Sequence, residues 1–302
     1  MRSLALTLEA EGKPDESEKI QREALAVWQK RGEGETQKAL LALENLCRAL
    51  IIQKKFSDAE QSLNAALTPE LCGKPTSANL LALRAELRSR RGLWQEAAGD
   101  AALASGYQPT RNELYSVVAA LLAKTRNRAA YVQFCKRLLA TSAETSNIYV
   151  ADQVAKACLF LPTTETDLKV IGPLVDAALT RGTGDQGAIP FFQVCKGLYE
   201  YRQGHYAEAI EWAQKPLKTS STSAHGHAYG ILALAYWRME QKDEARQMLT
   251  NGDKLVPAIM PVQIAEDPGN AWRAWLFARI QLDEAAALIR PQPTNTNSSN
   301  HP

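Results

Sequence analysis

Apolar residues recur along the chain in pairs of amphipathic stretches, and a short polar turn separates the two stretches of each pair. Residues 197–217 show the plan most clearly. The first stretch begins with a small residue and continues with aromatic and aliphatic residues. A turn with a glycine and acidic residues follows. The second stretch begins after another small residue and again has apolar residues at helical spacing. The helical spacing of the apolar positions predicts antiparallel helical hairpins. The same plan returns in residues 5–25, 47–67, 85–103 and 233–249, and in a weaker form in 119–139 and 154–179.

The small residue that follows each turn gives the period of the repeat. The residues at this position are Ser17, Ala59, Ala97, Tyr131 (not small), Ala209 and Ala245. Successive positions lie 34 to 42 residues apart, except for one gap of 78 that holds two units. This is the period of helix–turn–helix repeats, which bury their apolar faces by stacking on one another.

The period predicts an all-α fold, a right-handed α-α superhelix of about seven helical hairpins. A loop and a capping helix are expected over 256–290, and a disordered tail over 291–302. The repeats are expected near residues 1–30, 40–68, 78–106, 111–140, 147–181, 189–218 and 225–253.

Five positions of the unit 197–217 resemble the tetratricopeptide repeat (TPR) family. They are the small residue Gly197, the turn residue Gly204, Tyr206, Ala209 and Leu217. Pro216 departs from the family pattern and is expected to end the second helix early. The resemblance implies a non-catalytic scaffold that holds a peptide or helix in the groove lined by the first helices of the hairpins.

Four segments carry a narrower resemblance. Residues 151–162, 191–215, 233–249 and 271–289 together look like the C-terminal TPR arrays of large bacterial, planctomycete-type serine/threonine protein kinases. This implies a regulatory or docking part of such a kinase system. The sequence has no VAIK-like lysine strand, HRD loop or DFG motif. The first unit lacks the opening turn of its first helix, so we expect either a fragment or a ragged first helix.

Composition and charge narrow the class of protein further. The 302 residues carry a net charge of +2, which argues against a nucleic-acid-binding protein. No apolar run approaches the roughly eighteen residues of a membrane span. The five cysteines are far apart and no export signal is recognised, so we expect buried, reduced thiols in a cytoplasmic protein. His225 and His227 lie on different helix faces, so no metal site is expected.

Patterns that could indicate catalysis are interpreted as structural. GTGDQG at 182–187 matches GxGxxG, but helix-like stretches flank it, so we interpret it as an inter-repeat loop. No GxSxG nucleophile pattern occurs. Acidic pairs recur at the start of second helices, where they suit the helix dipole: Asp15/Glu16, Asp58/Glu60, Glu208/Glu211 and Asp243/Glu244. We expect no catalytic residue, no cofactor and no enzymatic activity; an enzyme with an unrecognised cleft is the alternative.

Basic residues recur near the ends of the first helices. Four of six residues five positions after the small residue are basic: Arg90, Lys124, Arg202 and Arg238. Tyr201 and Trp237 precede the last two, and cations beside aromatic rings suit an acidic peptide. The alternative is that these cations suit the helix dipole and face water. The carboxylate clamp of chaperone-binding repeats is not apparent, because its positions hold Glu44, Arg48, Val194 and Leu198.

Trp272 and Trp275 lie three residues apart and therefore on one face of the closing helix. We expect them to cover the open end of the solenoid, because a terminal repeat needs such a cover. The alternatives are a partner-binding patch at this end, or a subunit interface in a structural, self-associating array.

Overall fold

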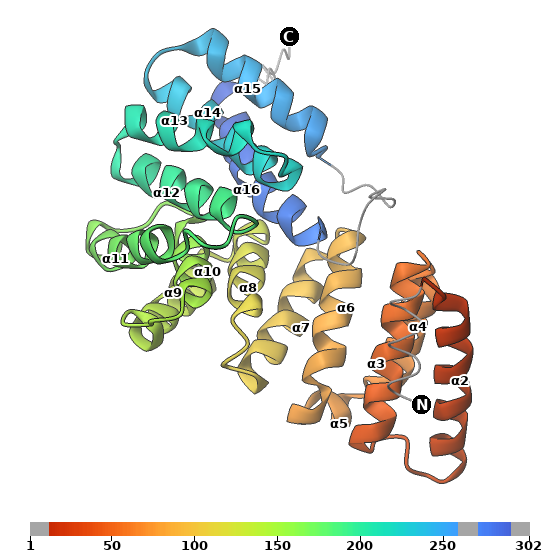
Figure 1. The fold of residues 1–302 in the computed structure, drawn as a ribbon. Coiled ribbons are helices and arrows are strands. Elements are labelled where there is room, and N and C mark those ends of the chain that lie inside the picture. Colours follow the sequence, from red (N-terminus) through yellow and green to blue (C-terminus); the bar gives the residue numbers. More distant parts are fainter. Residues whose placement is uncertain (1–11, 259–270, 291–302) are drawn as a thin grey trace, which may run out of the picture.

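The structure, a computed structural model, describes residues 12–258 and 271–290 and has no strand in these ranges. Figure 1 shows an array of stacked helices. This confirms the predicted all-α solenoid. The α-helices are α2 (Pro14–Lys30), α3 (Gln37–Ile52), α4 (Phe56–Ala66), α5 (Pro69–Cys72), α6 (Ala78–Arg90), α7 (Trp94–Tyr107), α8 (Glu113–Lys124), α9 (Arg128–Ser142), α10 (Ile148–Leu159), α11 (Glu165–Arg181), α12 (Ile189–Gln203), α13 (Tyr206–Gln214), α14 (Thr222–Arg238), α15 (Lys242–Leu255) and α16 (Ala271–Ile289). Short 3-10 turns cover Pro75–Ser77 and Pro216–Lys218.

Within the described part of the chain, consecutive helices form six hairpins. The hairpins are α3/α4, α6/α7, α8/α9, α10/α11, α12/α13 and α14/α15. The second helix of each hairpin contacts the first helix of the next, and α2 packs on α3 in the same way. Helix α2 therefore takes the place of a second helix. Any first helix before it would fall in residues 1–11, which lie outside the described residues, as does the predicted tail.

A left-handed residue ends the first helix of several hairpins. Gly204 has φ of 86° directly after α12, as its place in the repeat predicts, and Gly92 has φ of 75° two residues after the end of α6. Lys54, Arg126 and Glu240 adopt φ of 61°, 58° and 62° at the corresponding turns. Glycine adopts this conformation at the least cost, but the hairpin turn imposes it on other residue types as well.

The second helices follow the predicted chemistry. Pro216 stands in a 3-10 turn just after α13 ends at Gln214, so this helix is short, as expected. Gly197 on α12 lies against α13, because a Cβ atom there would be 3.3 Å from the backbone nitrogen of Ala213. Acidic residues occupy the first turns of these helices at Asp15, Glu16, Asp58, Glu208, Asp243 and Glu244.

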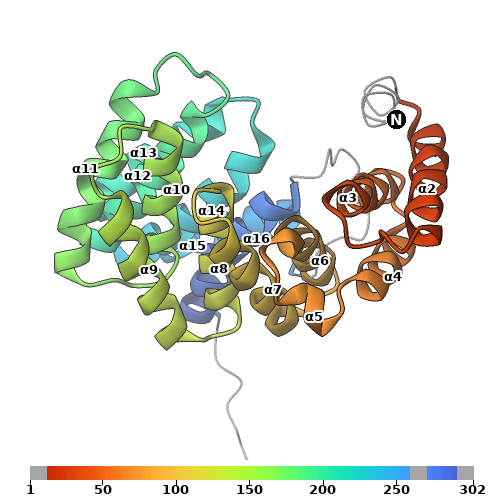
Figure 2. The same cartoon turned by 90° about the horizontal axis from the view of Figure 1, so that it is seen from below.

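The closing helix α16 lies along the array and not only at its end. It packs most extensively on α14 and also contacts α15 and α8, although α8 begins more than a hundred residues earlier (Figures 1 and 2). One continuous cluster of buried apolar residues runs from Ala85 on α6 to Ile289 on α16. A second cluster joins α3 and α4 to α6 and α7. Helix α16 thus covers the last hairpin, as expected of a closing helix, and it also extends along the array to α8.

Three glycines allow α16 to approach the last hairpin closely. A Cβ atom on Gly230 of α14 would lie 2.8 Å from the Cβ atom of Gln281, and one on Gly226 would lie 3.3 Å from that of Ala278. A Cβ atom on Gly252 of α15 would lie 2.3 Å from a methyl group of Leu282. Since Gly226 and Gly230 are one helical turn apart, they form a groove in α14 that fits α16.

We predict that Gly230→Ala destabilises the fold although alanine is the better helix former. The added methyl group meets the backbone and Cβ of Gln281, so the free energy of unfolding should fall by about 1–3 kcal/mol. The matched control is Gly99→Ala in the middle of α7, where a Cβ atom meets no atom of the described residues within 4 Å. This control should raise stability by up to about 1 kcal/mol. Urea denaturation followed by circular dichroism measures both, and a stabilised Gly230→Ala variant would contradict the close packing.

Candidate partner-binding groove

The first helices of the hairpins form one surface, which we call the inner face: α3, α6, α8, α10, α12 and α14. On α14 this face is covered by α16, which also contacts α8, Phe160 after α10 and Arg202 of α12. Phe277 of α16 lies 5.2 Å, centroid to centroid, from Phe160 after α10, and 6.4 Å from His227 of α14. Gln281 is hydrogen-bonded to His227 at 3.1 Å. The inner face therefore already holds one amphipathic helix of the chain itself.

Two of the basic residues that the sequence placed in the groove bind α16. Arg202 donates two hydrogen bonds to the carboxylate of Glu284, at 2.6 and 2.7 Å, and also donates to the carbonyls of Leu159 and Phe160. Its side chain is only 4% exposed. Lys124 pairs with Asp283 at 2.6 Å. These cations are engaged within the chain, so the expectation of a row of cations open to a peptide does not hold for them.

The other two expected cations differ in their surroundings. Arg90 is buried, pairs with Glu86 at 2.9 Å and lies over the ring of Phe56. Arg238 is exposed, and the neighbouring hydroxyl of Tyr201 raises the pKa of its guanidinium.

The aromatic members of the set serve packing. Tyr201 is buried, with its ring 5.7 Å from that of Tyr206. The ammonium group of Lys242 lies 3.8 Å over the ring of Trp237. Of the four expected cations, Arg90, Lys124 and Arg202 pair with carboxylates of the chain itself, whereas Arg238 is exposed.

Trp272 and Trp275 are buried at 4% and 6% exposure and do not form an exposed end patch. The Trp275 ring is stacked on Trp94 of α7 at 6.2 Å with an interplanar angle of 7°, and its Nε1 donates to the carbonyl of Pro257. Trp272 lines a cavity at the N-terminal end of α16. A subunit interface through these two rings therefore has no exposed surface to use.

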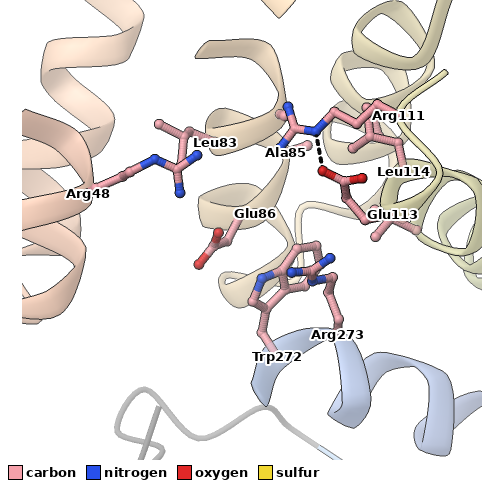
Figure 3. Close-up of a pocket in the computed structure, with 12 residues that line it drawn as sticks. Arg48, Leu83, Ala85, Glu86, Arg111, Glu113, Leu114, Trp272 and Arg273 are labelled. Carbon is pink, nitrogen blue, oxygen red and sulfur yellow. Dashed lines mark hydrogen bonds and ion pairs between the residues drawn. The ribbon is translucent and has the colours of Figure 1, made fainter. Parts of the chain in front are cut away.

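The inner face continues beyond α16 as a charged surface, which we call the open part. Figure 3 shows Arg48 of α3, Arg111 before α8 and Arg273 of α16 converging on a cavity of about 90 Å³ beside Glu86. Arg48 pairs with Glu44 at 2.9 Å, and its side chain is 43% exposed. No residue of this set stood among the predicted contacts, because the arginines come from three separate elements. One sequence signal does point to Arg48, which occupies a position of the carboxylate clamp in chaperone-binding repeats.

The charges of the open part are balanced. Burial alone would raise the pKa of Glu113, but the hydrogen bond and charge of Arg111, 2.6 Å away, lower it below its ordinary value. Burial lowers the pKa of Arg273, and the charges of Glu86 and Glu113 oppose that shift. Alternating charges of both signs suit a polar polypeptide segment.

The GTGDQG segment is a loop between α11 and α12, as predicted. Asp185 in this loop accepts hydrogen bonds from the backbone of Gly187 and Ala188 and from the hydroxyl of Tyr149, the last at 2.7 Å. The loop thus fixes Tyr149 at the start of α10, at the edge of a second cavity of about 250 Å³ on the inner face.

The cysteine thiols are shielded from solvent or nearly so. Four of the five cysteines are buried and all five are unpaired; burial raises the pKa of the Cys47 thiol to about 12. Such thiols act as small apolar groups. Across residues 12–258 and 271–290, no three potential ligand side chains lie together at a spacing that would hold a metal ion. No helix in the same part of the chain is long and apolar enough to cross a membrane.

We predict that Glu284→Gln weakens the packing of α16 on the inner face. The substitution leaves the buried Arg202 guanidinium without its charged partner, so the free energy of unfolding should fall by about 1–3 kcal/mol. The control is Glu165→Gln in the exposed pair Glu165–Lys169, whose side chains are 84% and 74% exposed. This control should change stability by less than about 0.5 kcal/mol. Equal effects of the two substitutions in urea denaturation would mean that the Arg202 contact does not secure α16.

We predict that His227 makes the protein less stable in mild acid. Burial first, and then the Lys156 charge, lower the pKa of His227 to about 3, so the folded state stays neutral while the unfolded chain gains a proton below about pH 6.5. The free energy of unfolding should therefore fall from pH 6.5 toward pH 5, by up to about 1.4 kcal/mol per pH unit. His227→Gln should remove most of this slope, whereas His225→Gln, two residues earlier, should keep it. Urea denaturation at several pH values measures the slope, and an unchanged slope in His227→Gln would refute the assignment.

The comparisons with known proteins agree with the repeat architecture. The family described as tetratricopeptide repeat matches residues 1–31. A solved structure of a tetratricopeptide repeat protein from Parabacteroides merdae is similar over 84% of this chain and 91% of its own, with a TM-score of 0.53 and 15% sequence identity. No curated protein matches the chain. The structural likeness shows the fold, an all-α solenoid of the kind that tetratricopeptide repeats form.

Proposed function

We propose that the chain is a non-catalytic scaffold of the TPR family that binds a polypeptide segment on the open part of its inner face. The observation that supports this most directly is α16 itself. The inner face holds this helix through the ring contacts of Phe277 with Phe160 and His227, through close glycine contacts on α14, and through the Arg202–Glu284 pair. A surface built this way can hold a helix or an extended segment, and its open part is the portion that α16 leaves to a partner.

The charge of the open part supports an acidic partner segment. The side chain of Arg48 is 43% exposed while that of its partner Glu44 is 11% exposed, so the cation of this pair is the group presented to solvent. In the second pair, at the opposite side of the same cavity, Arg111 is 25% exposed and its partner Glu113 is 43% exposed, so Arg48 is the more exposed of the two cations. Acidic side chains of a bound segment can pair with these two guanidinium groups.

The resemblance of residues 151–162 and 191–215 to kinase-associated arrays supports a context for this binding. In this proposal the chain is the docking or regulatory part of a bacterial serine/threonine kinase system in the cytoplasm, and its partner is a protein of that system. The buried thiols are consistent with a reducing compartment.

A peptide selection tests the proposed surface. Peptides that bind the chain are selected from a random displayed library, and their dissociation constants are measured by calorimetry at low and high salt. We expect peptides rich in Asp and Glu whose binding weakens with salt. The double variant Arg48→Gln/Arg111→Gln should bind them about tenfold or more weakly, which corresponds to roughly 1.4 kcal/mol.

The matched control removes the same charge from second helices. Lys169→Gln/Arg246→Gln changes two exposed cations on α11 and α15, each in a helical ion pair, and should leave the affinity unchanged. If both double variants bind the peptides equally weakly, the loss of affinity comes from the change in net charge and not from Arg48 and Arg111. Selected peptides that bind the Arg48/Arg111 variant as tightly as the wild type would place the binding surface elsewhere.

A further inference from the structure

The second cavity of the inner face lies between α8, α10, α12, α14 and the first turns of α16, and encloses about 250 Å³. Its lining combines aromatic rings with buried polar groups. The lining residues used below are Tyr149, Asp152, Lys156, Phe191, Phe192, His227, Arg273 and Phe277.

The polar groups of the cavity come from one buried ion pair. Asp152 and Lys156 lie one turn apart on α10, and their side chains are 5% and 6% exposed. Lys156 donates one hydrogen bond to Oδ2 of Asp152 at 2.7 Å, whereas an ammonium group carries three donors. Oδ1 of Asp152 is buried and has no hydrogen-bond partner among the residues that the structure describes. Burying an ion pair with unused donors and acceptors destabilises the folded state. A ligand that forms hydrogen bonds with both Asp152 and Lys156 removes this penalty.

The charges around the cavity are balanced. The Asp152 and Lys156 charges cancel, and Arg273 at its edge interacts with Glu86 and Glu113. The remaining titratable groups are neutral. Burial holds His227 in the neutral form, and burial also raises the pKa of the Cys195 thiol, which faces Asp152. A ligand with a net charge would upset this balance in a site of low solvent exposure, whereas a neutral polar group would not.

The aromatic residues favour a flat group. Phe192 and Phe277 are buried, and the Lys156 ammonium lies 5.7 Å over the Phe191 ring. Tyr149 is 47% exposed and is held at the edge of the cavity by its bond to Asp185, so a ligand can enter beside it.

We propose that this cavity binds a primary carboxamide, whose carbonyl oxygen accepts from Lys156 and whose NH₂ group donates to Oδ1 of Asp152. The primary amide is a neutral group that offers an acceptor and a donor side by side in one plane. The source of the amide rests on the proposed function: it is the Gln or Asn side chain of the bound segment. A free small amide would make the same contacts.

Three small probes of matched shape test the chemistry: benzamide, benzoate and benzylamine. Binding is measured by calorimetry and by NMR chemical-shift changes of the labelled protein. We expect benzamide to bind at least tenfold more tightly than either charged probe. Asp152→Leu/Lys156→Met replaces the pair by apolar side chains of similar volume, should keep the fold, and should weaken benzamide binding tenfold or more. The exposed-pair control Glu165→Gln/Lys169→Met should bind benzamide as the wild type does.

The selected peptides identify the source of the amide. If changing a peptide Gln or Asn to Leu weakens binding to the wild type but not to the Asp152/Lys156 variant, the amide comes from the bound segment. Binding of benzamide without such a peptide effect assigns the cavity to a free small amide, and shows that the cavity chemistry holds even where the scaffold proposal fails. Preference for benzoate or benzylamine, equal benzamide affinity in the Asp152/Lys156 variant, or no binding of any probe would overturn the proposal.

Discussion

The seating of α16 on the inner face is the contact on which the C-terminal half of the molecule depends. Gly226 and Gly230 remove the side chains that would keep α16 away from α14, and Arg202 satisfies Glu284 as well as the carbonyls of Leu159 and Phe160 at the end of α10. A repeat hairpin buries its apolar face only against a neighbour. Here a helix distant in sequence provides that neighbour for several hairpins at once.

The packing of α16 separates the inner face into an apolar part that α16 covers and a charged part that it leaves open. Where α16 lies, it meets Phe160 after α10 and the Gly226, His227 and Gly230 positions of α14, and Phe160 and His227 are buried. At the first turns of α16 the face becomes charged, with Arg48 and Glu86 around one cavity and the Asp152–Lys156 pair in the other. Apolar surface left open would favour aggregation, so covering it with α16 leaves polar surface for a partner.

Residues whose sequence pattern suggests peptide binding can instead pack against another helix of the same chain. A row of cations near the ends of first helices is typical both of a peptide-binding groove and of groups that hold another helix of the same chain. Lys124 pairs with Asp283 and lies 5.5 Å over the Trp94 ring. The burial of such a cation, and not its place in the repeat, decides which of the two roles it has.

The sequence by itself determined the hairpins. The period of small residues, Gly92 and Gly204 at turns, acidic residues at second-helix starts and Pro216 after α13 all act through neighbours in the chain, so local rules suffice for them. Only the tertiary structure decided where α16 lies, because nothing in the local pattern says which distant surface an apolar helix will cover. The engagement of Arg202, the burial of Trp275 and the meeting of Arg48, Arg111 and Arg273 all follow from that placement. This placement brings residues as many as 225 positions apart to one cavity, and it depends on three-dimensional packing that sequence periodicity does not encode.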